Sequence, residues 1–304
     1  MVDAQSPALS DLGAVPSSAN AAGPLAEQRK LMALDKFNEA ELSLRAYLVS
    51  DERSAQARYL LAYALMRQNK PKDSLEEYTR AAALQTPNAE QLREVGQDYV
   101  LLGDYPDAGK WFLRSLDLND ADPEGWYSLG RLRYTEQRFG DAADCFQRAL
   151  VLAPGNVKVE NNLGLAYEGL NRTDDAVAAY RQAIAWQDAG PPEKLSEQPL
   201  LNLAIAVMHR GQMSEAHSLL ARAASIAPKD SRIQEQLGQV LMQEGNYLEA
   251  EKHLTLATQL DPGQSNLHYL LGQTYRHLGR LQEAKTEFDI AARLANVTAN
   301  SKPE

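Results

Sequence analysis

The chain has 304 residues, a formal net charge of −10 and a pI near 5.1. This acidic balance argues against non-specific binding to nucleic acid or to an anionic membrane surface, because both are negatively charged themselves. The single cysteine, Cys145, excludes an internal disulfide. No apolar run approaches the ~18 residues of a membrane span, so we expect no nucleic-acid partner and no membrane-spanning segment.

The first 20 residues predict a flexible tail, because Ala, Ser, Pro and Gly dominate residues 1–20. No charged segment followed by an apolar one is present, so the tail holds no intact signal peptide. Val2, Asp3 and Ala4 would suit the small-residue end of a signal-peptide cleavage site. Two interpretations follow, namely the mature part of an exported protein or an ordinary disordered N-terminus. We expect a soluble protein that is either cytoplasmic or exported (periplasmic or secreted) with its signal removed.

A small residue recurs every 34 residues along the rest of the chain. The series consists of Ala40, Ser74, Ala108, Ala142, Ala176, Ala216, Ala250 and Ala284, with one slip of six residues after Ala176. A fixed period of this length is typical of stacked supersecondary units rather than of one globular core. Small side chains at one phase indicate a point where two backbones approach closely.

Other positions keep the same phase and predict a helical hairpin in each period. A Leu-Gly or Leu-Ala pair lies upstream of most members of the series, as at Leu163 and Gly164. A large residue follows the series by four positions and a small one by seven, as at Tyr180 and Ala183, which places both on one helix face. Gly or Asn, as at Gly103, marks the turn between the helices. The small residues predict close packing within a hairpin, and the large ones predict filling between hairpins.

The pattern resembles the tetratricopeptide repeat (TPR) family. The fullest match lies in the fourth repeat, at Trp126, Leu129, Gly130, Ala142, Phe146, Ala149 and Pro154. The first repeat is the poorest match, with Glu27 and Gln28 in place of Leu-Gly, as expected of a terminal repeat. The resemblance implies an all-α, right-handed superhelical solenoid over residues 21–298, with eight helix-turn-helix repeats that begin at residues 21, 55, 89, 123, 157, 197, 231 and 265.

The six-residue slip is an insertion at residues 191–196, between the fifth and sixth repeats. Gly190 and the two prolines after it break the helix, and Ser196 is able to cap the next one. We favour a longer surface loop over a hinge or a contact for a partner, since loops vary freely without function. Residues 299–304 are polar and predict a short C-terminal tail. The last helix either caps the stack itself or pairs with another chain, so we expect a monomer or a weak homo-oligomer.

The resemblance also implies a concave groove lined by the first helix of each repeat. The lining positions carry seven basic and five acidic side chains, so the groove is less acidic than the rest of the chain. Tyrosines add contact area at low entropic cost, arginines add forked donors, and amides hydrogen-bond an extended peptide backbone. The candidate residues for binding a peptide or protein are Tyr59, Tyr63, Arg67, Arg93, Gln97, Tyr127, Arg131, Tyr134, Asn161, Asn162, Asn202, His209, Gln239, Tyr269, Gln273 and Arg276.

The predicted ligand is a protein or peptide segment, and the basic residues of the groove favour one with acidic side chains. One TPR subgroup clamps a C-terminal carboxylate with Lys and Asn side chains at fixed repeat positions. Only Asn162 and Asn202 match that set, so we expect no carboxylate clamp of this kind.

No pattern in the chain predicts catalysis. The five histidines form no metal-binding motif, and no phosphate-binding loop or nucleophile elbow is present, so we expect no catalytic residue, no metal and no cofactor. Cys145 has no local histidine partner and is interpreted as a partly buried thiol. The leading interpretation is a non-catalytic protein–protein interaction scaffold. Two alternatives stay open: an exported assembly factor for a pilus or secretion complex, and the regulatory part of an enzyme.

Overall fold

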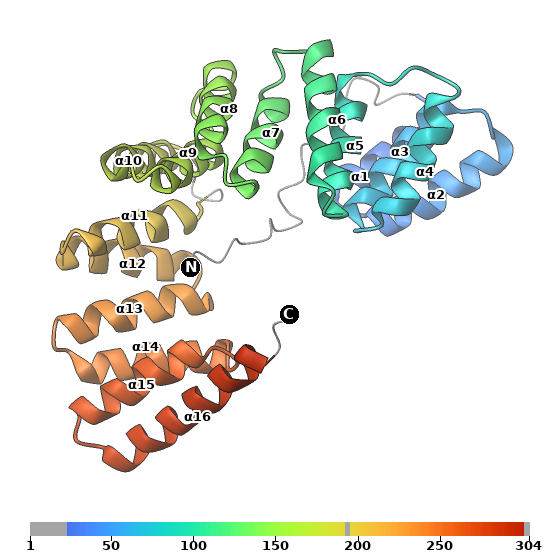
Figure 1. Cartoon of the computed structure of the whole chain (residues 1–304). Helices are drawn as coiled ribbons and strands as arrows, with labels where there is room; N and C mark the ends of the chain where they lie inside the picture. The colour runs from blue at the N-terminus through green and yellow to red at the C-terminus, as the bar shows by residue number, and fades with distance from the viewer. Residues whose placement is uncertain (1–22, 192–194, 301–304) are drawn as a thin grey trace. The chain divides into compact units, whose positions relative to one another are not determined.

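The computed structural model describes residues 23–191 and 195–300. Within these ranges the chain forms α-helices and no β-strand, which confirms the predicted all-α fold (Figure 1). The tail predicted at residues 1–20 lies outside the described residues. The helices form two compact units, which divide between Pro154 and Gly155.

Each unit is built from four consecutive helical hairpins. The N-terminal unit contains α1 (Ala26–Ala33), α2 (Phe37–Ser50), α3 (Ala55–Arg67), α4 (Pro71–Ala82), α5 (Ala89–Leu101), α6 (Tyr105–Leu118), α7 (Pro123–Thr135) and α8 (Phe139–Leu152). The C-terminal unit contains α9 (Val157–Gly169), α10 (Thr173–Asp188), α11 (Gln198–His209), α12 (Met213–Ile226), α13 (Ser231–Gln243), α14 (Tyr247–Leu260), α15 (Ser265–His277) and α16 (Leu281–Asn300). Within a unit, the second helix of each hairpin packs on the first helix of the next, as α14 does on α15.

The turn inside each hairpin contains one residue with a positive backbone φ. Gly103 has a φ of 76°, a conformation that residues with a Cβ atom rarely adopt, and three later turns also use glycine. The other four turns place a residue with a side chain in the same left-handed region: Asp35, Asn69, Gln137 and Asn171. The expected signal of Gly or Asn therefore misses two of the turns, because Asp and Gln also adopt this conformation here.

The glycines of the first helices make room for a large side chain of the same hairpin. A Cβ atom on Gly130 would lie 2.6 Å from the Phe146 ring, and one on Gly96 would lie 2.7 Å from the Phe112 ring. Both rings are buried. The large residue thus fills the space inside its own hairpin, whereas the sequence pattern suggested that it fills the space between hairpins.

The residues of the 34-residue series lie in the interior of the hairpins, where each is at most 3 % exposed. Apolar side chains also connect neighbouring hairpins. In the C-terminal unit one continuous apolar cluster connects Tyr180 on α10 with Leu200, Leu220 and Leu237 on α11, α12 and α13. Stability in this unit therefore comes from contacts between successive hairpins, as in other repeat folds.

Several first helices begin at a polar residue that accepts a backbone N–H from the first turn, which fixes the start of the helix. These capping residues are Ser54, Asn88, Asp122, Asn156 and Asp230. At the other end of the chain α16 continues through Asn300, so it includes the first two residues of the segment predicted as a C-terminal tail.

The described residues around the insertion are tied to α10. Gln187 is buried near the end of this helix, and its side-chain oxygen accepts the backbone N–H of Ser196 at 2.8 Å. The Ser196 hydroxyl accepts the N–H of Gln198, the first residue of α11, at 3.2 Å. The rest of the insertion predicted at 191–196 includes residues 192–194, which lie outside the described residues.

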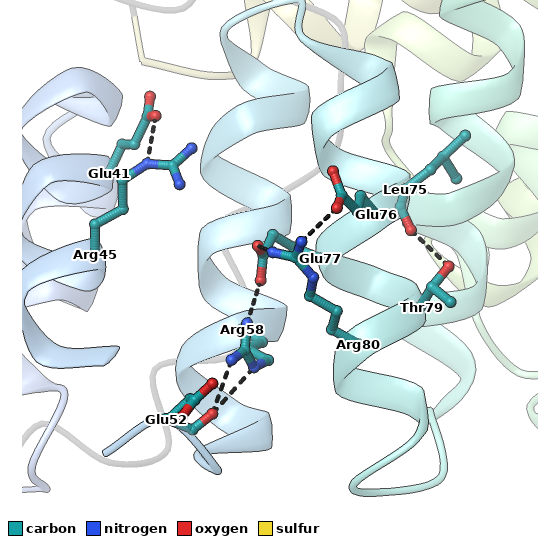
Figure 2. Close-up of polar contacts among 9 residues, drawn as sticks. All are labelled: Glu41, Arg45, Glu52, Arg58, Leu75, Glu76, Glu77, Thr79 and Arg80. Carbon is teal, nitrogen blue, oxygen red and sulfur yellow. Dashed lines mark hydrogen bonds and ion pairs between the residues drawn. The ribbon is translucent and has the colours of Figure 1, made fainter. Parts of the chain in front are cut away.

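Charged side chains connect α3 with α4 in the N-terminal unit, as Figure 2 shows. Arg58 on α3 donates to Glu77 on α4 at 2.8 Å, and both side chains are largely buried. Arg58 also donates to the carbonyl of Glu52 at 2.8 Å, and Arg80 donates to the second oxygen of Glu77 at 2.6 Å. The neighbouring pair of Arg80 with Glu76 is exposed.

Candidate functional site

The structure divides the predicted groove residues between the first helices of the two units. We call the surface formed by α3, α5 and α7 the N-terminal first-helix face and that formed by α9, α11, α13 and α15 the C-terminal first-helix face. Neighbouring first helices contact each other directly, as α3 contacts α5 and α13 contacts α15. Each face carries half of the predicted residues.

Six of the predicted residues are buried, with only 2–7 % of their surface exposed: Tyr59, Tyr63, Arg93, Gln97, Tyr127 and Asn161. The sequence predicts open side chains at these positions, but side chains of the second helices pack against two of the rings, as Tyr78 does on Tyr59 and Phe146 on Tyr127. Seven others are half-buried: Arg67, Arg131, Tyr134, Asn162, Asn202, Gln239 and Gln273. The three exposed ones are His209, Tyr269 and Arg276.

The tyrosines of α3 are part of the core rather than of an open surface. The Tyr59 ring packs against the Tyr78 ring, with 6.0 Å between centroids, and its hydroxyl donates to the carbonyl of Gln85 at 2.6 Å. The Tyr63 hydroxyl accepts a hydrogen bond from Arg67 at 2.9 Å. Arg67 also forms a 3.3 Å ion pair with Asp35, so its charge is already engaged within the chain.

Helix α5 carries three buried ionisable side chains, Arg93, Glu94 and Asp98. Arg93 Nε lies 3.2 Å from Asp122 Oδ2 without the alignment of a hydrogen bond. The next residue, Glu94, is buried and accepts a hydrogen bond from the Tyr78 hydroxyl. Burial raises the pKa of Glu94 to about 8, although the bond from Tyr78 acts in the opposite direction. The carboxyl of Glu94 is therefore mostly protonated at neutral pH.

Asp98, one turn further along α5, is also buried and pairs with Ser74 of the 34-residue series. The Ser74 hydroxyl lies 2.6 Å from Asp98 Oδ2 and 2.9 Å from the carbonyl oxygen of Ala62. A hydroxyl has one proton, and a carbonyl only accepts, so both contacts are satisfied when Ser74 donates to Ala62 and a protonated Asp98 donates to Ser74. Burial correspondingly raises the pKa of Asp98 to about 8.

The C-terminal first-helix face has the more open amide side chains. Asn202 on α11 donates to Asn161 Oδ1 on α9 at 2.9 Å, which fixes the register of the two helices. Asn162 and Asn202 are both half-buried, so part of each residue is accessible to solvent. Each lies on the same helix face as the residue three positions further along, which is Leu165 on α9 and Ile205 on α11.

Those residues are apolar, and the sequence prediction omitted them. Leu165 on α9, with Ile205 and Met208 on α11, are partly buried and pack on the edge of the core. They occupy the repeat positions that the TPR resemblance assigns to the groove, and this was the signal that could have identified them. Amides and aliphatic side chains thus lie together on α9 and α11.

Further along the face, the charged groups are mostly engaged within the chain. Glu235 on α13 accepts hydrogen bonds from Asn266 at 2.6 Å and from Gln239 at 3.0 Å. Burial raises the pKa of Glu235 above its ordinary value, against the effect of these two bonds. Arg232 forms a 2.9 Å ion pair with Asp230. This part of the face therefore offers little free positive charge to an acidic ligand.

An open pocket of about 580 Å³ lies between α15 and α16. Its apolar wall consists of side chains of α16, and its other wall carries polar and aromatic groups of α15. The Tyr269 ring is 49 % exposed and lies 5.7 Å from the Phe288 ring. The lining residues are Ser265, Asn266, Tyr269, Arg276, Phe288, Ala291, Ala292 and Ala295.

The described residues contain no group of three His, Cys, Asp or Glu side chains placed to hold a metal ion. Cys145 is buried beside the Gly130 position of its own hairpin, and burial raises the pKa of its thiol to about 11. A thiol with this pKa is almost entirely protonated at neutral pH and is a poor nucleophile.

One model of the tetratricopeptide repeat matches residues 25–90, 61–125 and 127–194, and a second model of the same repeat matches residues 241–297. The chain belongs to the tetratricopeptide repeat family. No helix in the part of the chain that the structure describes has the length and apolar character needed to cross a membrane.

Curated relatives match parts of this TPR chain, and two of them illustrate the extent. The peroxisomal targeting signal receptor of Kluyveromyces lactis is 34 % identical over 109 residues, which are 36 % of this chain and 18 % of the receptor. The human protein O-mannosyl-transferase TMTC3 is 25 % identical over 140 residues, which are 43 % of this chain and 15 % of the transferase. The chain therefore spans less than a fifth of the length of either relative.

Among solved structures, the chain resembles PilW, described as a widely conserved type IV pilus biogenesis factor. The TM-score is 0.58 and the sequence identity is 20 %, over 66 % of this chain and 90 % of PilW. At this identity the likeness concerns the TPR fold.

Proposed function

We propose that this TPR protein is a non-catalytic interaction scaffold whose C-terminal first-helix face binds an extended peptide segment of a partner protein. The observation that carries the proposal is the hydrogen bond between Asn161 and Asn202, which holds neighbouring first helices in register beside the half-buried amide of Asn162. Relatives include a receptor for a targeting signal, which supports recognition of a peptide.

An amide side chain supplies one acceptor and two donors, and an extended peptide backbone presents both kinds of group to its neighbours. Asn202 uses one donor internally and keeps its remaining groups for a ligand. Because α9 and α11 lie side by side, a peptide that crosses them meets two amides in succession.

The ligand segment carries an apolar residue where it crosses α9 and α11. Leu165 and Ile205 are partly exposed there, and covering them with an aliphatic side chain would remove more apolar surface from water. The expectation that the ligand carries acidic side chains receives little support. Two of the arginines on which it rested, Arg67 and Arg93, lie in the N-terminal unit and pair with acidic residues there.

The experiment is selection of peptides from a random 10-residue display library on the immobilised chain, followed by calorimetric titration of the selected peptide. The double substitution Asn162→Ala and Asn202→Ala is expected to weaken binding at least tenfold, which is about 1.4 kcal/mol. Gln182→Ala, which removes an exposed amide on α10, is the control and is expected to bind as the unmodified chain. Equal binding by the double variant, or selection of no common apolar sequence, would contradict the proposal.

The proposed scaffold needs no catalytic group of its own, and the amides and aliphatic residues require no cofactor. The same face would bind a peptide whether the chain stays in the cytoplasm or is exported, so the proposal does not depend on the compartment.

A further inference from the structure

We propose that the pocket between α15 and α16 binds an amphipathic helix of a partner protein, in the place that the first helix of a ninth repeat would take. This proposal does not depend on the peptide site on α9 and α11, because the two surfaces share no residue.

The preceding repeat of the same chain shows what fills such a pocket. The residues 34 positions before Phe288, Ala291 and Ala292 are Leu254, Ala257 and Thr258 on α14, and all three are buried. Leu254 packs against Gly238 of its own hairpin, and the next first helix, α15, packs on α14. On α16 the equivalent Ala292 and the neighbouring Ala295 are exposed, since no described helix follows.

A hydrogen bond marks the polar edge of the filled position. Glu235 on α13 accepts from Asn266 on α15, the helix that occupies the pocket of that repeat. The residue 34 positions after Glu235 is Tyr269, whose exposed ring lines the open pocket. The pocket is therefore the same structural position, with one wall of polar and aromatic groups and one of small apolar residues, and no helix among the described residues occupies it.

The buried face of the chain's own first helices defines the partner helix. On α13 the residues Ile233, Leu237 and Val240 are buried, and on α15 Leu267 and Leu271 occupy the first two of these positions. The partner helix thus carries aliphatic residues at positions i, i+4 and i+7, which lie on one side of a helix. Its other side is polar, because it faces water.

Arg276 gives the partner helix a preferred charge. Arg276 lines the pocket, and the described residues include no acidic group paired with it. Three repeats earlier the same position is Glu168, which interacts electrostatically with His209 on the following first helix. By the same register Arg276 faces position i+10 of the incoming helix. An acidic residue there would form a forked ion pair with Arg276.

The probe for the test is a fluorescein-labelled peptide with the sequence of residues 230–246, in which Glu replaces the residue equivalent to Gln243. That residue is i+10 when Ile233 is i. Fluorescence anisotropy with the whole chain is expected to show saturable binding. A second peptide with Lys at the same position is expected to bind at least fivefold more weakly.

Two substitutions assign the binding to the pocket. Ala292→Arg places a large side chain in the pocket and is expected to abolish binding of both peptides. Arg276→Glu is expected to reverse the preference, so that the Lys peptide binds more tightly than the Glu peptide. A variant that had merely lost its fold would not gain affinity for the Lys peptide. Arg293→Glu reverses an exposed charge of α16 outside the pocket and is expected to preserve the order of affinities.

Sedimentation velocity separates a partner helix from a second copy of this chain. A concentration-dependent dimer that Ala292→Arg converts to monomer would assign the face to self-association and overturn the proposal. Binding of both peptides unchanged by Ala292→Arg would overturn it as well. The Asn162→Ala and Asn202→Ala variant is expected to bind the helical peptide normally, so failure of the peptide-groove proposal is distinguished from failure of this one.

Discussion

The Ser74 hydroxyl lies 2.6 Å from the Asp98 carboxyl, and both side chains are completely buried. Ser74 is the only member of the 34-residue series that is not alanine. Where the other repeats have the methyl group of alanine, Ser74 has a hydroxyl, and its hydrogen bond to Asp98 connects α4 to α5. The second carboxyl oxygen, Asp98 Oδ1, has no hydrogen-bond partner among the described residues. An ionised Asp98 would therefore be costly here, and a neutral one is not.

The N-terminal unit is expected to lose stability as the pH rises from about 4 to about 8. Burial raises the pKa of both Asp98 and Glu94 to about 8, whereas carboxyls of the unfolded chain titrate near 4. Between these values the folded state binds more protons than the unfolded state, so the free energy of unfolding falls with rising pH. The charged neighbours of Glu94 are Glu90 and Arg93, and Asp98 faces Glu94. Urea unfolding at several pH values measures the slope.

Asp98→Asn is the matched variant for this pH dependence. The amide has the same shape and remains neutral, so the variant is expected to be more stable than the unmodified chain at pH 8 and to show a shallower slope. The paired control, Asp117→Asn, removes a carboxyl at an exposed position of α6 and is expected to leave the slope unchanged. Identical slopes for the Asp98 variant and the unmodified chain would contradict the assignment.

Gly130→Ala is expected to destabilise the N-terminal unit by roughly 1–3 kcal/mol, because the new Cβ atom would lie 2.6 Å from the Phe146 ring. Gly140→Ala is the matched control in the same hairpin, since a Cβ atom there meets nothing within 4 Å. This control is expected to be neutral or to stabilise by up to about 1 kcal/mol, as alanine favours the helix. Chemical denaturation that gave equal changes for both substitutions would argue against the packing of the hairpin.

Glu77→Gln is expected to cost about 1–3 kcal/mol, because it removes the charge opposite a largely buried Arg58. Glu76→Gln removes a neighbouring carboxylate whose side chain is 61 % exposed, and is expected to change stability by less than about 0.5 kcal/mol. Thermal unfolding followed by circular dichroism compares the two. A larger effect of the Glu76 substitution would refute the ranking by burial.

Cys145 is expected to react with a thiol reagent only when the N-terminal unit opens. The thiol is buried, so the reagent cannot reach it in the folded unit. Burial also raises the pKa of the thiol to about 11, so little of the reactive thiolate is present at pH 7. Labelling in native buffer is expected to be at least a hundredfold slower than in denaturant. Rapid labelling of the native chain would show that α8 opens independently of its neighbours.

The period of the chain was enough to predict the hairpins, because helical spacing and small residues repeat in every copy. It could not predict that Phe146 packs against Gly130 within one hairpin, since the same pattern is compatible with packing between hairpins. The turns at Asp35 and Gln137 were also missed, because the expected signal was Gly or Asn, whereas Asp and Gln adopt the left-handed conformation there. Local context, rather than residue type, decides these details.

The candidate site was less predictable than the fold. Repeat position placed Tyr59, Tyr63 and Tyr127 on the face that first helices share, but it gave no measure of how closely those helices pack. Their burial depends on neighbouring side chains such as Tyr78, which differ from one repeat to the next. The basic residues of the predicted groove were misleading in the same way. Arg67 and Arg93 pair with acidic residues from other parts of the chain, which the repeat position does not reveal.

The contacts between α4 and α5 limit how this chain can change by gain or loss of whole repeats. Tyr78 and Ser74 belong to one hairpin, and the two buried carboxyls that they contact belong to the next. Deleting residues 55–88 would preserve the 34-residue phase yet leave Glu94 and Asp98 facing the side chains of another hairpin. We therefore expect the second and third repeats to be gained or lost only as a pair.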